Sequence, residues 1–243
     1  MKMLMKGMTV AILLAGLMSF TAQATVFTQL ATQDTSLKPY KVNNNYNGTG
    51  WGFRVSDENP DAAIGGDVYT GIVGGFTLPD LGGENLVSAT LRLETINPAG
   101  SWLDPDGNGT VEIGAYRLGS AWDETTATWN TPSPGWGAPG VAGTASTPVD
   151  IQLTTHTPAV HWEEWNVTTD VADMYANIAP NYGWMLQVEN PGDGRIWFNR
   201  HENGEAGTAQ LVIETAPIPE PGSLFLLGTG LLSLVSFVRR KRS

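Results

Sequence analysis

The sequence predicts an all-β domain, a β-sandwich of the jelly-roll type with one short helix. Short segments in which apolar and polar residues alternate recur along the chain, as expected for strands with one buried face. The turn-forming residues glycine and proline, 29 and 15 in number, separate these segments. A single segment between residues 25 and 216 has a helical pattern. Many short strands with one helix are typical of two antiparallel sheets packed face to face.

The individual elements follow from these patterns. Four segments alternate most clearly and are expected to be strands: residues 89–94, 110–118, 184–188 and 210–214. Clusters of turn-forming residues are expected to lie between strands: residues 43–50, 79–84, 104–109, 132–140 and 190–194. The helix is expected over residues 170–177, with Thr168 or Thr169 as its N-cap and Val171, Met174 and Tyr175 on one face.

The N-terminus has the features of an export signal. Lys2 and Lys6 precede an apolar stretch over residues 8–20, and Ala22-Gln23-Ala24 fits a small-x-small cleavage site. Residues 1–24 are therefore predicted to be a secretory signal peptide. The remaining body, residues 25–216, is long enough to bury a sizeable core. Because the chain has no cysteine, this body must be held together by packing alone, without disulfides.

The C-terminus is predicted to be a separate sorting segment, residues 217–243. Pro219-Glu220-Pro221 is followed by an apolar run over residues 222–238 and then by the basic residues 239–242. As a helix, the apolar run would be about 25 Å long. This is slightly short of a hydrocarbon core of roughly 30 Å, a difference that snorkelling basic side chains can cover. The basic end is expected to stay cytoplasmic and the body to lie outside.

This tail resembles the PEP-CTERM sorting signal of Gram-negative bacteria in its three ordered parts: Pro219-Glu220-Pro221, the apolar helix and the basic end. The resemblance implies that an exosortase-type membrane protease recognises and removes the tail, so that the helix holds the protein in the membrane only transiently. The protein is then expected at the cell surface or in the extracellular matrix. A plain single-pass anchor with an accidental Pro-Glu-Pro is the alternative.

The net charge of the body restricts the classes of partner that it can bind. With seven basic and 23 acidic residues, residues 25–216 carry a net charge of −16. Such a surface repels nucleic acid and anionic membranes, so neither is an expected partner of the body. The sequence shows no basic patch for a polyanionic glycan, which argues against strongly charged glycans as ligands unless calcium bridges them.

The second half of the body carries a family signal. Its most specific part is Trp-x-Glu-x-x-x-Thr-Trp, formed by Trp122, Glu124, Thr128 and Trp129. Three further matching segments follow in order: residues 165–171, 181–184 and 200–202. Over about residues 60–215 the chain resembles the DNRLRE domain, a family of carbohydrate-binding-module-like jelly rolls in secreted proteins. The triplet over residues 200–202, Arg-His-Glu, departs from the more usual Ser-x-Glu of that family.

The tryptophans suggest where a glycan would bind. All nine lie in the body, and three of them, Trp51, Trp102 and Trp136, lie in loops rich in Gly, Pro and Asp. Large apolar side chains in such loops are candidates for exposed platforms on which sugar rings stack. The alternative is that the loops fold back and bury these three rings. Trp122 and Trp129 are expected instead to pack under the end of the sandwich, with Glu124 and Thr128 capping backbone groups.

One loop resembles the start of a calcium site. Asp104, Asp106 and Asn108 place oxygen ligands at alternate positions, and Glu112 lies within reach. The twelfth position of an EF-hand loop would be Ala115, which has no carboxylate, so a true EF-hand is excluded. The remaining choice is between a partial site for structural calcium and an uncoordinated hairpin turn. No other cofactor is predicted.

No spacing in the chain indicates catalysis. The sequence contains neither a Gly-x-Ser-x-Gly elbow nor a His-Glu-x-x-His zinc motif, and Glu163 and Glu164 would lie on opposite faces of a strand. We therefore expect an exported, non-catalytic surface or matrix protein that binds extracellular polysaccharide. A purely structural matrix protein and a polysaccharide-degrading enzyme are the alternatives. Ice binding would require a repeated Thr-x-Thr array, and Thr126-Ala127-Thr128 occurs once.

Overall fold

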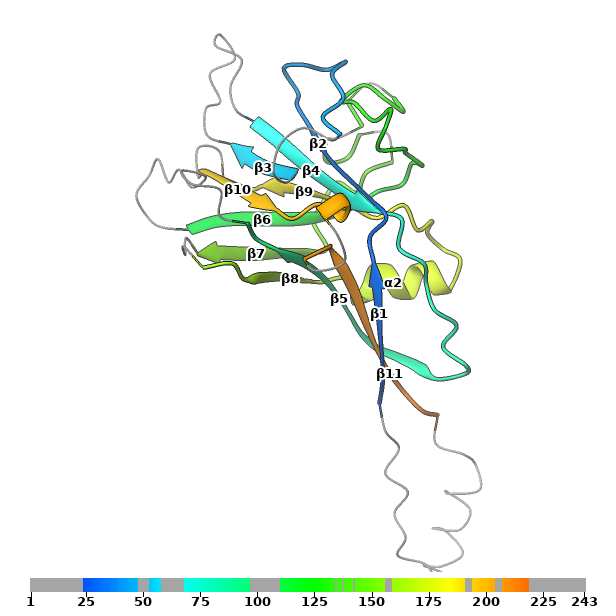
Figure 1. Cartoon of the computed structure of the whole chain (residues 1–243). Helices are drawn as coiled ribbons and strands as arrows, with labels where there is room; N and C mark the ends of the chain where they lie inside the picture. Colours follow the sequence, from blue (N-terminus) through cyan, green and yellow to red (C-terminus); the bar gives the residue numbers. More distant parts are fainter. Residues whose placement is uncertain are drawn as a thin grey trace, which may run out of the picture. The chain divides into compact units, whose positions relative to one another are not determined.

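The computed structural model describes residues 24–47, 53–57, 68–96, 110–133, 135–136, 138–141, 143–155, 159–190, 194–203 and 207–218. The strands in these ranges are β1 (Thr25–Leu30), β2 (Gln33–Leu37), β3 (Phe53–Asp57), β4 (Val68–Gly74), β5 (Asn85–Glu94), β6 (Thr110–Arg117), β7 (Asp150–Thr155), β8 (Trp162–Asn166), β9 (Trp184–Val188), β10 (Gly194–Phe198) and β11 (Gln210–Ala216) (Figure 1). The helical elements are α2 (Thr168–Tyr175) and the short 3-10 helix η2 (His201–Asn203).

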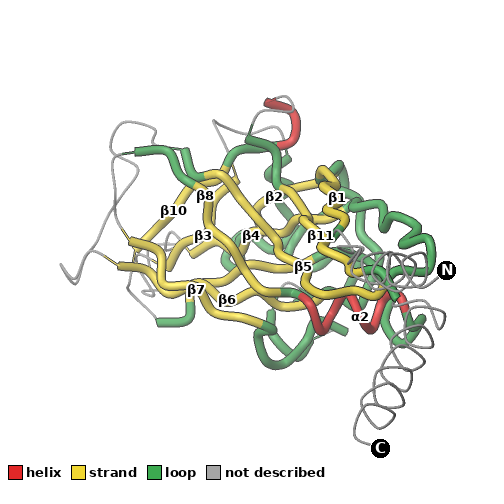
Figure 2. The backbone as a smooth tube through the Cα atoms, turned by 90° about the horizontal axis from the view of Figure 1, so that it is seen from below, coloured by secondary structure: helices red, strands yellow, loops and turns green. Residues whose placement is uncertain are grey.

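The strands form two antiparallel sheets, so the predicted β-sandwich class is confirmed (Figure 2). One sheet has the order β1-β11-β5-β8, and the other has the order β10-β3-β4-β9-β6-β7, with β2 also paired to β4. All four strands predicted from alternation are present as β5, β6, β9 and β11. The chain divides into two compact units, and the sandwich belongs to the larger one, residues 26–80 and 86–214.

Aromatic side chains join the two sheets. Trp165 of β8 is fully buried, and its Nε1 donates a hydrogen bond to the carbonyl oxygen of Ile113 on β6, at 2.9 Å. The centroid of its ring lies 6.0 Å from that of Phe198 on β10, in an edge-to-face arrangement. The donor of the indole is thus satisfied inside the core, as a buried Trp requires.

Helix α2 differs in detail from the expected helix. It begins at Thr168 and ends at Tyr175, and its N-cap is Val167, which supplies no capping side chain. The Thr168 hydroxyl instead accepts a hydrogen bond from the Ala89 N–H of β5, at 2.9 Å. The Thr168 N–H, an orphan donor of the first turn, reaches the Asn166 Oδ1 at 3.1 Å. The predicted cap is therefore used to hold the helix to the neighbouring strand.

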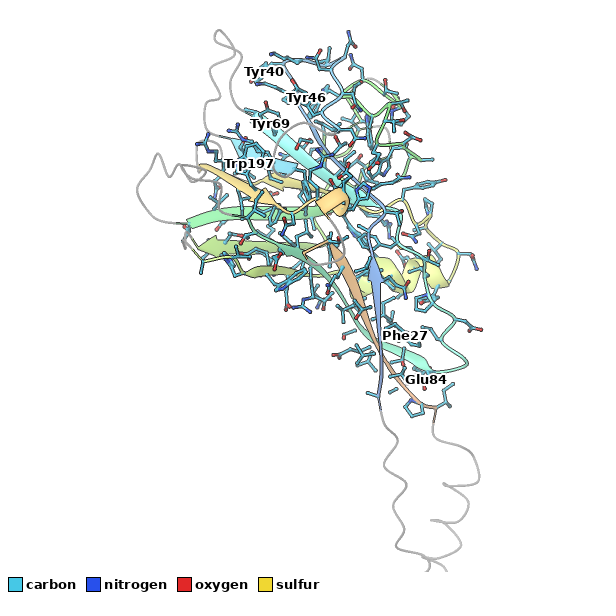
Figure 3. The ribbon with its side chains drawn as sticks, viewed as in Figure 1. Phe27, Tyr40, Tyr46, Tyr69, Glu84 and Trp197 are labelled. Atoms are coloured by element: carbon cyan, nitrogen blue, oxygen red, sulfur yellow. The ribbon has the colours of Figure 1, made fainter. Side chains whose placement is uncertain are left out.

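The described part of the smaller unit centres on Glu84. Its carboxylate accepts hydrogen bonds from the hydroxyls of Thr25, at 3.1 Å, and of Thr215. The Thr215 hydroxyl also lies 3.2 Å from the carbonyl oxygen of Thr25. Glu84 is labelled in Figure 3. The first and last described strands of the chain are thus tied together at this carboxylate.

The export features lie outside the described residues, apart from Ala24 of the signal peptide (residues 1–24) and the first two residues of the sorting segment. This applies to Pro219-Glu220-Pro221 and to the predicted membrane helix over residues 222–238. None of the helices within the described ranges has the length and hydrophobicity of a membrane-spanning segment.

Candidate functional site

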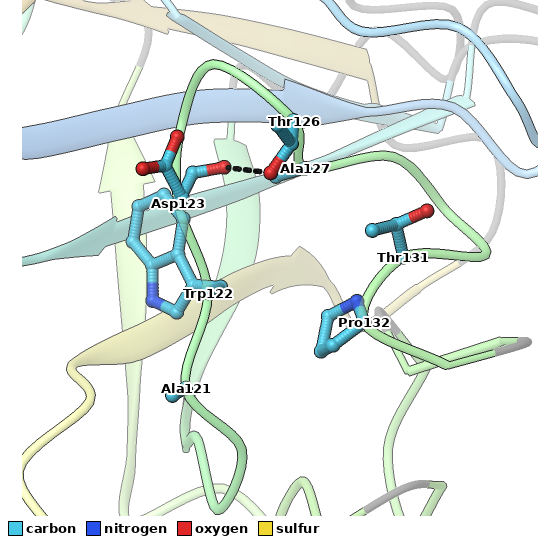
Figure 4. Close-up of a pocket in the computed structure, with 7 residues that line it drawn as sticks. All are labelled: Ala121, Trp122, Asp123, Thr126, Ala127, Thr131 and Pro132. Carbon is cyan, nitrogen blue, oxygen red and sulfur yellow. Dashed lines mark hydrogen bonds between the residues drawn. The ribbon is translucent and has the colours of Figure 1, made fainter.

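The loop that follows β6 lines an open surface hollow with a volume of about 340 Å³ (Figure 4). Its lining residues combine an aromatic ring, a proline, two hydroxyls and one carboxylate: Ala121, Trp122, Asp123, Thr126, Ala127, Thr131 and Pro132. Trp122 and Pro132 lie on opposite sides of it in Figure 4. A small number of polar groups beside apolar walls is the usual composition of a ligand site.

Trp122 is held firmly although it is only partly buried. Its Nε1 donates a hydrogen bond to the Tyr182 carbonyl oxygen at 2.8 Å. Its ring packs on that of Trp136, with the centroids 6.4 Å apart and the planes 35° apart. Because the polar end of the indole is already satisfied by the protein, what remains for a ligand is the apolar surface of the ring.

Asp123 supplies a carboxylate at the rim of the hollow. It accepts hydrogen bonds from the Thr125 N–H at 2.8 Å and from the Thr125 hydroxyl at 2.5 Å. These bonds stabilise the charged form and lower the pKa of the fully exposed Asp123 carboxyl. The group is therefore ionised and can accept further hydrogen bonds from ligand hydroxyls.

The far side of the same loop is anchored to β2 and the segment after it. The Asn45 side-chain amide donates to the carbonyl oxygens of Glu124 and Ala127, both at 2.7 Å. The Glu124 carboxylate accepts the Asp34 N–H at 3.2 Å, and the Thr128 hydroxyl accepts the Asn130 N–H at 3.2 Å. The expectation that Glu124 and Thr128 cap backbone groups is confirmed.

A buried ionic cluster lies next to this anchor. Asp34 has 0% exposure, and its Oδ2 accepts the backbone N–H of His201 at 2.6 Å. Burial raises the pKa of Asp34 to about 6, although the hydrogen bond from His201 opposes the rise. Arg200 makes two hydrogen bonds to Glu202, at 2.9 and 3.1 Å, and one to the Asn47 Oδ1, at 2.6 Å. The triplet over residues 200–202, which departs from the DNRLRE pattern, thus forms an ionic network with Asp34 of β2.

The structure corrects one predicted platform. Trp136 is 0% exposed, and its Nε1 donates to the Thr128 carbonyl oxygen at 2.6 Å. It belongs to a core cluster with Leu37, Ile72 and Met185, so it offers no ring face to a ligand. The physical reason is that the Gly- and Pro-rich segment around it folds back through turns and covers the core. Trp51 and Trp102 lie outside the described residues.

The predicted calcium loop is described at one position only. Asp104, Asp106 and Asn108 lie outside the described residues. Glu112, on β6, accepts a hydrogen bond from the Asn190 side-chain amide at 2.7 Å.

A second pair of aromatic rings, Tyr69 of β4 and Trp197 of β10, flanks Arg54 of β3 (Figure 3). The Arg54 Cζ lies 4.8 Å from the centroid of the Tyr69 ring and 5.6 Å from that of Trp197, and the Lys38 Nζ lies 4.7 Å from the Tyr69 ring. Both cations are buried, so they support the rings from within and present no basic patch. Because cations already contact the Tyr69 ring, it is less suited than Trp122 to stack on a sugar.

The expectation for the paired glutamates is confirmed. Glu163 of β8 is buried, and Glu164 is exposed and bridges to Arg92 on β5 at 2.7 Å. Burial raises the pKa of Glu163, which is partly offset by its hydrogen bond with the His161 Nε2, at 2.7 Å. The two carboxylates therefore face different surroundings and do not form an acid and base pair.

An antiparallel β-sandwich that presents a partly exposed tryptophan beside ionised and hydroxyl groups is compatible with a carbohydrate-binding module. Comparison with known families agrees: the model of carbohydrate-binding module family 96 matches residues 74–215, more than half of the chain. The chain belongs to this family. The model of the PEP-CTERM protein-sorting motif matches residues 217–242. Comparison with curated proteins gives no match.

The sequence indicates the segment that forms the hollow but not its role. The motif predicts packing for Trp122, which does pack on Trp136 but also lines the hollow. Asp123 and Thr126 lie within the Trp-x-Glu-x-x-x-Thr-Trp segment, whose density of polar residues between two tryptophans is the signal that could have indicated a site. Thr131 and Pro132 carry no such signal, because only the fold of the loop brings them opposite Trp122.

Proposed function

We propose that the protein binds extracellular polysaccharide, without catalysis, through the hollow at Trp122. The observation that carries this proposal is the pairing of the fixed Trp122 ring with the ionised Asp123 carboxylate at the rim of one hollow. Sugar rings have apolar C–H faces that stack on an indole, and their hydroxyls donate to carboxylates. Membership in a family of carbohydrate-binding modules supports this assignment.

The composition of the hollow favours binding over cleavage. Glycoside hydrolysis generally uses two carboxyl groups roughly 5–10 Å apart. Asp123 is the single carboxylate among the residues that line the hollow. Its lowered pKa also makes it a poor general acid at neutral pH.

In the fragment of residues 25–216, we expect Trp122→Ala to weaken glycan binding by about tenfold or more, because a stacking contact is lost. Asp123→Ala should weaken it by about three- to tenfold, because a charged hydrogen bond is lost. A glycan array identifies a ligand, and calorimetry measures its affinity. Trp162→Ala is the matched control, because Trp162 is also partly exposed but stacks on Arg92 of β5. Equal losses in all three variants would contradict the site.

Binding to no neutral or acidic polysaccharide would favour the purely structural matrix protein. The array is repeated with calcium and with a chelator, because Asp104, Asp106, Asn108 and Glu112 are proposed to form a partial calcium site. Trp51 and Trp102 remain proposed as additional platforms. Their alanine variants are measured with the same ligand, and a site confined to Trp122 would leave both at wild-type affinity.

We further propose that the protein is exported and processed at its C-terminus by an exosortase-type membrane protease, then retained at the cell surface or in the matrix. The matched sorting motif supports this route. Replacing Pro219, Glu220 and Pro221 together by alanine is expected to leave a larger, membrane-bound precursor. Fractionation and immunoblotting of the producing cells measure this, and normal release of the variant would refute the role of the motif.

A further inference from the structure

Side chains from three separate segments converge on one atom, the Nδ1 of His201. The Asp34 Oδ2 of β2 lies 3.2 Å from it, the Glu124 Oε2 of the loop after β6 lies 3.5 Å away, and the Glu202 Oε2 of η2 lies 3.3 Å away. None of these groups is close to the others in sequence except His201 and Glu202. The side chains of His201 and its three neighbours do not line the hollow at Trp122.

The Asp34 contact of His201, at 3.2 Å, is a long hydrogen bond, and the Glu202 and Glu124 contacts are longer still. An imidazole nitrogen carries at most one hydrogen, so it cannot donate to three carboxylates at once. A charge-assisted hydrogen bond of this kind is usually about 2.7–2.9 Å long. The same protein contains such a bond, between His161 and Glu163, at 2.7 Å. Around His201, by contrast, there are three longer and nearly equal contacts.

The distances from the His201 Nδ1 to the Asp34 Oδ2 and the Glu202 Oε2 match the edges of a tetrahedral metal site. With ligands about 2.1 Å from a central ion, neighbouring ligand atoms lie about 3.4 Å apart. We propose that Asp34, His201 and Glu202 form a binding site for a divalent transition-metal cation, with one imidazole nitrogen and two carboxylate oxygens as ligands. Asp34, His201 and Glu202 each offer a ligand atom within 4.8 Å of the other two.

A second observation concerns the other oxygen of the Asp34 carboxylate. The Oδ1 of the fully buried Asp34 has no hydrogen-bond partner, and the Arg200 Nε lies 3.5 Å from it. Buried carboxylate oxygens are normally satisfied by donors or by metal ions. The negative charge of a carboxylate is spread over both of its oxygens. A cation bound at the Asp34 Oδ2 would therefore also compensate the charge on Oδ1.

The charges of the cluster fit a divalent ion. Three carboxylates and the Arg200 guanidinium leave a net charge of about −2 when His201 is neutral, which is the form that binds a metal. Arg200 already pairs with Glu202 through both of its oxygens, so an ion would share that carboxylate. The site is reachable from solvent, because the side chains of Glu202 and His201 are 39% and 20% exposed.

The ligand set selects the kind of metal. Calcium takes six to eight oxygen ligands, whereas an imidazole with carboxylates suits zinc, manganese and related ions. Glu124, 3.5 Å from the His201 Nδ1, belongs to the loop that carries Trp122 and Asp123, so the metal site lies beside this loop. The metal site itself requires no glycan, and its test is independent of the proposed function.

The test is calorimetric titration of the full-length, tag-free chain in detergent, after treatment with a chelator, with ZnCl2, MnCl2 and CaCl2. We expect one zinc or manganese ion per chain, a raised melting temperature, and calcium binding at least about tenfold weaker. His201→Gln and Glu202→Gln should each weaken zinc binding by about tenfold or more. Both side chains are partly exposed, and their melting temperatures in chelator establish that the variants fold.

His161→Gln and Glu163→Gln are the matched controls, because they alter the other histidine–carboxylate pair, which has the spacing of a hydrogen bond. Unchanged zinc affinity in these two variants supports the proposal. Absence of stoichiometric zinc and manganese binding would overturn it. So would calcium affinity equal to that of zinc, or equal losses in the His201 and His161 variants.

Discussion

Replacing Trp136 by alanine is expected to lower the free energy of unfolding by about 3–5 kcal/mol, the usual cost of deleting a large buried aromatic side chain. The ring is fully buried and packs with Leu37, Ile72 and Met185. For a domain of this size the melting temperature should fall by roughly 6–20 °C. Chemical denaturation followed by tryptophan fluorescence or circular dichroism measures the loss.

Two further variants separate packing from hydrogen bonding and from ligand binding. Trp136→Phe keeps most of the buried ring but leaves the Thr128 carbonyl oxygen without its 2.6 Å donor, which should cost about 1–3 kcal/mol. Trp197→Ala removes a partly exposed ring and should cost less than Trp136→Ala. A Trp136→Ala variant with wild-type stability and reduced glycan affinity would restore Trp136 as a platform and contradict its place in the core.

The case of Trp136 shows what loop composition can and cannot predict. Glycine and proline around it correctly indicate turns, such as those closed by the hydrogen bonds from the Trp136 N–H to the Ser133 oxygen and from the Gly140 N–H to the Ala145 oxygen. The amino-acid composition of a loop does not predict which part of the core the loop will pack over. Here the Thr144 hydroxyl donates to the Trp136 carbonyl oxygen at 2.6 Å, which holds the loop over its own tryptophan.

Alternation predicted four of the strands, and the strands that it missed include two with polar residues at inward positions. In β5 the buried positions are Ala89, Leu91 and Leu93, a regular pattern. In β8 one of the two inward residues is Glu163, so the expected pattern is interrupted. In β2 four consecutive residues are buried, and three of them are polar. Only the surrounding structure explains why these polar groups lie inside.

The ionic cluster around His201 could not be predicted from spacing, because Asp34 and His201 are 167 residues apart in the chain. The hollow at Trp122 was closer to prediction, since most of its residues come from one segment. In both cases the sequence does not predict the hydrogen bonds that bring β2 and the segment after it beside the loop that follows β6. These hydrogen bonds are made by Asn45 and Glu124, each of which looks like an ordinary loop residue in the sequence.

Replacing Gly183 by alanine is expected to destabilise the sandwich by about 3 kcal/mol or more. Gly183 has a φ of +92°, and an added Cβ would lie 2.0 Å from the Val73 carbonyl oxygen and 2.7 Å from the Gly74 Cα. These are backbone atoms of β4, so no side-chain rotation can relieve the clash. Gly183 immediately precedes β9, which pairs with β4, so the strands would have to separate at the centre of the larger sheet.

Gly83→Ala is the matched control, because Gly83 has nearly the same φ, +88°, but nothing within 4 Å of the added Cβ. It should show only the cost of placing alanine in a left-handed conformation, about 1–2 kcal/mol. The difference between the two variants in urea denaturation therefore isolates the steric contact between β9 and β4. Equal losses would show that the close approach at Gly183 is not needed, and that φ alone accounts for the glycine.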